Sequence, residues 1–108
     1  MNVVVVGPDR GIGDALAARG ARVSRIEGVA SGDRLREAGI ESADLLVVTD
    51  VHEATAVPVA LELNPDLRTV VYAPESVPEF VRGTLDLAIH PDVLPVEAVA
   101  EELTPELS

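Results

Sequence analysis

The sequence has no lysine, no cysteine and no tryptophan among its 108 residues. Without cysteine it cannot form disulfides, a thiolate nucleophile, a zinc knuckle or an iron–sulfur cluster. Without lysine it cannot use Schiff-base chemistry or any catalytic lysine. Aromatic residues are also scarce, with Tyr72 and Phe80 the one tyrosine and the one phenylalanine. These absences exclude several classes of enzyme before any motif is considered.

Positively charged residues are also few. The chain has 8 arginines and 19 acidic residues, so its formal net charge is −11. Such a chain has no basic stripe for a phosphate backbone, so nucleic-acid binding is not expected. No apolar run reaches the ~18–20 residues that span a bilayer, and no signal-peptide pattern is present. We therefore expect a cytoplasmic protein without membrane insertion.

Hydrophobic residues make up 47% of the chain and are mostly valine, alanine and leucine. This is enough for one folded domain of small side chains. We expect a single domain over residues 1–103, followed by a frayed tail at 104–108. Many acidic residues, arginine without lysine and small core residues resemble the proteins of salt-in halophilic archaea.

Apolar runs and helical patterns alternate along the chain. The runs predict five strands, at residues 1–6, 21–26, 43–49, 68–73 and 86–89. Helices are predicted between and after them, at 11–19, 31–38, 52–63, 78–82 and 95–103. Pro58 would kink the third helix unless it lies in the first turn. Strands that are apolar on both faces indicate a parallel sheet covered on both sides, hence an α/β, doubly wound, Rossmann-like three-layer sandwich.

A glycine-rich loop, GPDRGIG at residues 7–13, joins the first strand to the first helix. Gly7 permits a tight turn, Gly11 lets backbone N–H groups approach a pyrophosphate, and Gly13 lets the helix pack on the sheet. Glu27 follows the second strand, where an acid commonly binds ribose hydroxyls. This order favours a dinucleotide site. The other interpretation is a glycine-rich turn that binds nothing, because Asp9 would repel phosphate and the glycine spacing differs from Gly-x-Gly-x-x-Gly.

The same loop resembles that of short-chain dehydrogenases. Their catalysis needs a tyrosine four residues before a lysine, and this chain has no lysine. The resemblance therefore does not extend to dehydrogenase activity.

A second resemblance extends over nearly the whole chain. Four segments resemble the Trk/RCK N-terminal (TrkA-N-like) domains, which are nucleotide-binding regulators of potassium transport: 23–27 (VSRIE), 35–44 (LREAGIESAD), 47–50 (VVTD) and 83–91 (GTLDLAIHP). The resemblance implies a parallel five-stranded sheet of order 3-2-1-4-5. It also implies a homodimer, and a transporter or separate effector subunit as partner.

This resemblance implies that the protein is a non-catalytic regulatory module that binds NAD(H) or an adenine nucleotide. The implied ligand contacts are phosphate at Gly7, Arg10, Gly11 and Gly13, ribose at Glu27, and the base or second ribose near Thr49 and Asp50. Ile12, within the loop, is also an implied cofactor-binding residue. No catalytic residue and no metal ligand is assigned.

Two alternatives stay open. Asp9, Asp50 and His90-Pro91 are placed roughly where a phosphoacceptor receiver domain has its acidic pocket and its Lys-Pro, although the lysine is absent. The chain could therefore be a Rossmann-like or pseudo-receiver interaction domain that has lost ligand binding. It could also be a small enzyme or enzyme fragment that uses the same crevice, with Asp50 and His90 meeting in space.

Asp50 has a structural interpretation as well. It is placed to N-cap the next helix, with Glu53 completing a capping box. His52 lies between them, so the three residues also form a candidate metal site.

The net charge predicts a stability that rises with salt. Multimolar KCl shortens the Debye length to ~3 Å or less and screens repulsion among the acidic groups. Thermal unfolding should shift upward by roughly 4–8 °C for each kcal/mol gained between dilute buffer and about 2 M KCl. Equal melting temperatures in the two solutions would contradict the halophilic interpretation.

Overall fold

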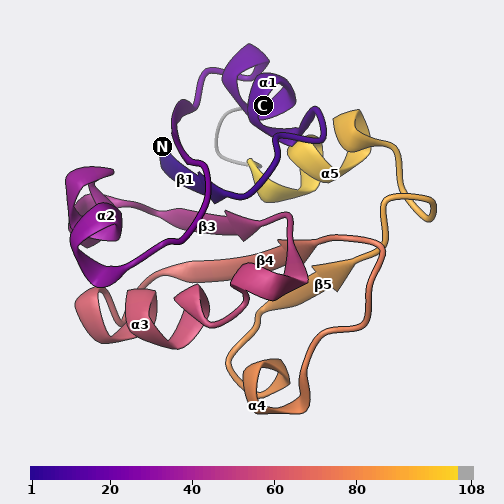
Figure 1. Cartoon of the computed structure of the whole chain (residues 1–108). Coiled ribbons are helices and arrows are strands. Elements are labelled where there is room, and N and C mark those ends of the chain that lie inside the picture. The colour runs from indigo at the N-terminus through magenta and orange to yellow at the C-terminus, as the bar shows by residue number, and fades with distance from the viewer. Residues whose placement is uncertain (105–108) are drawn as a thin grey trace.

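The computed structural model describes residues 1–104 and contains one five-stranded parallel sheet with helices on both faces (Figure 1). The strands are β1 (Asn2–Val6), β2 (Arg22–Ile26), β3 (Leu45–Val48), β4 (Arg68–Tyr72) and β5 (Leu87–Ile89). The helices are α1 (Ile12–Ala18), α2 (Gly32–Glu37), α3 (Ala56–Leu63), α4 (Glu79–Arg82) and α5 (Val96–Leu103). Within residues 1–104, no helix is long and apolar enough to cross a membrane.

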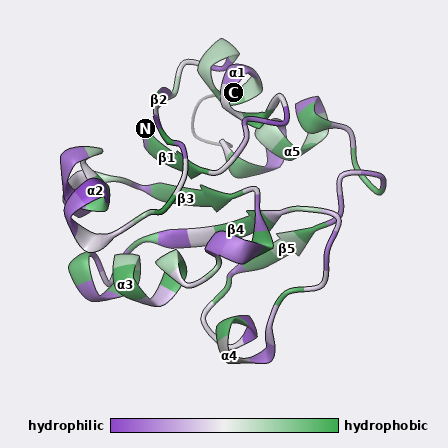
Figure 2. Cartoon of the chain, in the orientation of Figure 1, coloured by the Kyte–Doolittle hydropathy of each residue, from purple (hydrophilic) through white to green (hydrophobic). Residues whose placement is uncertain are grey.

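The sheet separates two hydrophobic clusters. Val3 and Val5 face α1 and α5, whereas Val4 and Val6 face α2 and α3. Figure 1 shows α1 and α5 on one side of the sheet and α2, α3 and α4 on the other. Figure 2 shows the hydrophobic central strands between these layers. The expected α/β doubly wound sandwich is therefore confirmed.

The strand order is 2-1-3-4-5, so the expected order 3-2-1-4-5 is wrong. All four residues of β3 are buried between β1 and β4. In contrast, β2 is an edge strand that exposes Arg22, Ser24 and Arg25. A strand with two arginines suits an edge, and a wholly apolar strand suits the centre of a parallel sheet.

The five predicted strands and five predicted helices are present, with shifted ends. The predicted helix at 52–63 divides into a 3₁₀ turn, Val51–Glu53, and α3. Pro58 is the third residue of α3, in the first turn, where its missing N–H removes no intrahelical hydrogen bond.

Thr104, which the sequence placed in a frayed tail, is buried. Its hydroxyl donates to the Ala100 carbonyl oxygen at 2.7 Å and accepts from the Arg19 Nε at 2.6 Å. This pair of hydrogen bonds joins the end of α5 to the end of α1. Residues 105–108 of the expected tail lie outside the described residues.

The Thr104 hydroxyl predicts a graded loss of stability. Thr104→Val removes both hydrogen bonds and leaves the Arg19 Nε–H without its acceptor, which should lower the free energy of unfolding by about 1–3 kcal/mol. Thr104→Ser keeps the hydroxyl and should retain most of the wild-type free energy of unfolding. Urea unfolding at fixed high KCl measures the difference, and equal values for the two variants would contradict the role assigned to the hydroxyl.

Candidate functional site

The carboxyl ends of β1 and β3 lie side by side, and the loops that leave them are in close contact. Gly7 has φ +107°, and a Cβ on it would lie 2.6 Å from the Thr49 Oγ1. The buried Thr49 hydroxyl donates to the Pro8 carbonyl oxygen and lies 3.2 Å from that of Val6. Gly7 is therefore required by the approach of Thr49.

Arg10, the cation expected to bind phosphate, crosses to the same loop. Its backbone is left-handed, with φ +53°, and its Nε donates to the Thr49 carbonyl oxygen at 2.8 Å. The structure therefore brings Gly7, Arg10 and Thr49 together. The contacts that join them are within the protein itself.

Asp9 occupies the space above the start of α1. Its Oδ2 accepts from the Gly11 N–H at 3.0 Å. A Cβ on Gly13 would lie only 2.1 Å from the Asp9 Oδ1, so this carboxylate fills the room that Gly13 leaves. Ile12 is completely buried and faces the core. A nucleotide loop uses this place for phosphate, and here it holds the chain's own carboxylate.

An acidic cavity of about 420 Å³ opens beside this loop. It is lined by the four carboxylates of Asp9, Glu27, Asp50 and Glu53 and by the Arg25 guanidinium. Gly7, Pro8 and Gly28 complete the lining. The Arg25 Nε lies 3.7 Å from the Asp9 Oδ1, and its Nη2 lies 3.5 Å from the Glu27 Oε1. No motif in the sequence points to Arg25, and its place at the end of β2 beside Glu27 is the one available signal.

Asp50 caps the turn that follows β3. One of its carboxylate oxygens accepts from the His52 N–H at 2.9 Å and lies 2.9 Å from the His52 Nδ1. The hydrogen bond from the His52 backbone is the main reason that the pKa of Asp50 is lowered. The cap is thus confirmed, but the capping box is not formed, because the Glu53 Oε1 accepts from the Ala30 N–H instead, at 3.1 Å.

Asp50 and His90 do not contact each other in this fold. They follow β3 and β5, and β4 lies between these strands, which puts the strand axes about 10 Å apart. The His90 Nδ1 instead accepts from the Asp92 N–H at 3.0 Å. Among residues 1–104, no group of three or more His, Cys, Asp or Glu side chains is arranged to hold a metal ion.

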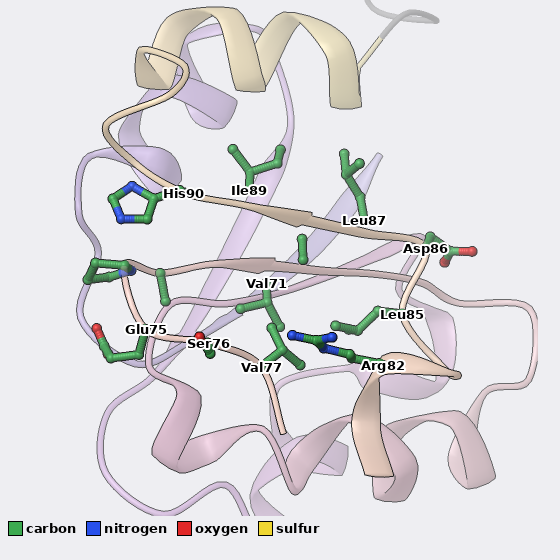
Figure 3. A pocket seen from close by; sticks show the side chains of 13 residues that line it. Val71, Glu75, Ser76, Val77, Arg82, Leu85, Asp86, Leu87, Ile89 and His90 are labelled. Atoms are coloured by element: carbon green, nitrogen blue, oxygen red, sulfur yellow. The ribbon is translucent and has the colours of Figure 1, made fainter. Parts of the chain in front are cut away.

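A second cavity, of about 540 Å³, lies between the β4–β5 edge and the segment that leads to α4 (Figure 3). Val71, Val77 and Leu85 form an apolar lining, and the Arg82 side chain lies beside them. Sequence reasoning missed this cavity, because the segment before α4 has no periodic pattern that would place it over the sheet.

Tyr72 ends β4 and was also given no role from the sequence. It is buried in the cluster between the sheet and α5. Burial is the main reason that the pKa of Tyr72 is raised, and the negative charges of Glu97 and Asp92 add to this effect.

The model of a family of unknown function, DUF7126, matches residues 3–103. The chain belongs to this family. No curated protein sequence matches it.

Solved structures that share the fold of this DUF7126 chain include three response regulators. An orphan response regulator of H. pylori is 18% identical over 100% of this chain and 97% of that one, with a TM-score of 0.75. An atypical orphan response regulator, described as having a phosphorylation-independent regulatory mechanism, is 18% identical over 99% and 95%, with a TM-score of 0.71. A CheY-like receiver domain protein from Methanospirillum hungatei is 18% identical over 98% and 92%, with a TM-score of 0.67. At such identities the likeness shows the fold alone.

The resemblance to Trk/RCK N-terminal domains is wrong. The family match is to DUF7126, and the structural neighbours include CheY-like receiver domains. The strand order 2-1-3-4-5 also differs from the order that the resemblance implied. The suggested connection to potassium transport rested on that resemblance and is withdrawn with it.

The contact between Asp9 and Gly13 predicts an unusual response to alanine in this DUF7126 chain. Gly→Ala within a helix normally stabilises by about 1 kcal/mol. Gly13→Ala should instead destabilise by about 1–2 kcal/mol, because the Asp9 carboxylate must leave the Gly11 N–H. Gly83→Ala is the control, since Gly83 has φ −69° and no atom within 4 Å of an added Cβ. Urea unfolding that shows Gly13→Ala as stable as Gly83→Ala would contradict this role of Asp9.

Proposed function

We propose that this chain is a receiver-like interaction domain that acts through its surface, without phosphorylation and without a bound nucleotide. The observation that carries the proposal is that four polar side chains at the carboxyl edge of the sheet hydrogen-bond to the chain's own backbone: Asp9, Arg10, Thr49 and Asp50. This is the pseudo-receiver alternative of the sequence analysis, and the receiver-like fold supports it.

The chain has no receiver lysine, and the arginine of the acidic pocket, Arg25, lies close to the Asp9 and Glu27 carboxylates. A transferring phosphoryl group is neutralised by metal ions and by lysine or arginine. Asp9 instead accepts from the Gly11 N–H just before α1, and Asp50 caps the turn after β3. The position of the receiver lysine holds His90, whose Nδ1 accepts from the Asp92 backbone. One neighbour of this fold is described as regulated independently of phosphorylation, which agrees with the proposal.

The electrostatics of the same edge disfavour a nucleotide. A phosphate above α1 would meet the Asp9 carboxylate, and the adjoining cavity adds Glu27, Asp50 and Glu53. Arg25 lies close to two of these carboxylates, and Arg10 donates to a backbone carbonyl. Binding of NAD or an adenine nucleotide stays a prediction from the sequence, and the proposal expects it to fail.

One titration at about 2 M KCl tests both parts, since salt screens the net charge. The protein is incubated with acetyl phosphate and Mg²⁺, with beryllofluoride and Mg²⁺, and separately with NAD, NADH, ATP, ADP or AMP. We expect no covalent phosphate by intact mass and no thermal shift. A ligand at 100 times its Kd would add about 2.7 kcal/mol of stability, which thermal unfolding resolves readily.

Asp50→Asn is the matched control for phosphorylation. It keeps the size of the side chain and an oxygen that can accept the His52 N–H. A phosphate adduct on the wild type that Asp50→Asn abolishes would establish a phosphoacceptor and contradict the proposal. A stabilising shift with any nucleotide that Gly11→Val removes would restore the nucleotide interpretation.

A further inference from the structure

The two edges of the sheet differ in how well they are protected against pairing with another strand. An edge strand offers unpaired N–H and C=O groups to other chains unless charge, proline or a covering segment blocks it. The β2 edge carries two arginines, Arg22 and Arg25. The β5 edge, Leu87-Ala88-Ile89, carries no charge within the strand and exposes Leu87 and Ala88.

The backbone of β5 shows which groups are free. The Ile89 carbonyl oxygen accepts from the Ala73 N–H at 3.2 Å, so the Ile89 backbone faces β4. Because successive residues of a strand direct their N–H and C=O groups to opposite edges, those of Ala88 face the open edge. Ala88 can therefore exchange two hydrogen bonds with an added strand.

The sequence of this edge is complementary to the same edge of a second copy of the chain. An antiparallel pair centred on Ala88 places Asp86 opposite His90 of a second copy, and Leu87 opposite its Ile89. Figure 3 shows Asp86 and His90 at opposite ends of β5, with Leu87 and Ile89 on the same side of the strand, toward α5. Each two-fold pair would therefore contain two acid–histidine contacts and two apolar contacts.

The local hydrogen bonds suit both polar partners. The His90 Nδ1 accepts from the Asp92 N–H, so the neutral ring carries its proton on Nε2 and can donate it. The Asp86 Oδ2 accepts from the Thr69 N–H at 2.8 Å, which holds the carboxylate at the strand end and leaves Oδ1 available.

We propose that two copies of this chain associate through β5, in an antiparallel pair centred on Ala88 that joins their sheets into one. This names a second copy as the partner of the proposed interaction domain and rests on that function. The complementarity of the Asp86 carboxylate, an acceptor, and the His90 Nε2–H, a donor, placed symmetrically about Ala88, is what selects a second copy over another strand. The apolar pairing of Leu87 with Ile89 covers a side chain that is 39% exposed in the single chain.

The experiment measures the molar mass of the protein in solution by light scattering. It is done at about 2 M KCl, because two chains of charge −11 repel each other in dilute buffer. The wild type should have twice the monomer mass at high concentration and dissociate on dilution. A wild type that stays monomeric at millimolar concentration overturns the proposal. This readout is separate from phosphate and nucleotide binding, so the two proposals can fail independently.

Substitutions at His90 form the matched pair. His90→Asp places two carboxylates opposite each other at both ends of the pair and should weaken the dimer by roughly tenfold or more. His90→Lys keeps an N–H donor opposite Asp86 and should leave the dimer intact. A dimer equally stable in both variants would place the interface elsewhere and overturn the proposal.

Ala88→Pro tests the backbone contact. It removes the N–H that faces the open edge and no hydrogen bond to β4, so it should dissociate the dimer, whereas Ala88→Thr should not. Far-UV circular dichroism checks that each variant is folded. If Ala88→Pro does not fold, the His90 pair decides by itself.

Discussion

The pairing of β1 with β3 at the centre of the sheet is the contact on which the other features depend. All residues of β3 and four of the five residues of β1 are buried, and Val6 pairs with Val48 at the carboxyl end. Because the two strands end together, the loop after β1 must pass directly over Thr49. That approach leaves no room for a side chain on Gly7 and brings Arg10 to the Thr49 carbonyl oxygen.

The consequence is a carboxyl edge whose groups bind one another. Many α/β sheets keep this edge open for a ligand. Here the Asp9 carboxylate lies at the start of α1, and the adjoining cavity gathers four carboxylates around Arg25. The unpaired edge of β5 and the cavity beside α4 lie on the other side of β4 from the acidic cavity. The interaction surface that we propose follows from this division.

Much of the fold could be predicted from the sequence, because apolar runs bounded by glycine and proline mark buried strands. The order of the strands could not be predicted from the runs alone, and a resemblance supplied a wrong one. The arginines of β2 against the wholly apolar β3 were the available signal for edge and centre. The glycine loop shows more clearly what the sequence alone does not predict. Spacing shows that Gly13 leaves room, but whether a phosphate or Asp9 fills that room depends on the path of the loop. The role of Thr104 likewise depends on a contact with Arg19, far away in the sequence.

The central claim is that the carboxyl edge of this domain is closed by its own side chains. The most direct test is an amide NMR titration at high KCl that follows the backbone resonances of Gly7, Gly11, Thr49 and His52. The account predicts that these resonances do not move when beryllofluoride with Mg²⁺, or NAD, is added in excess. Saturable shifts at these four amides with either ligand would contradict it.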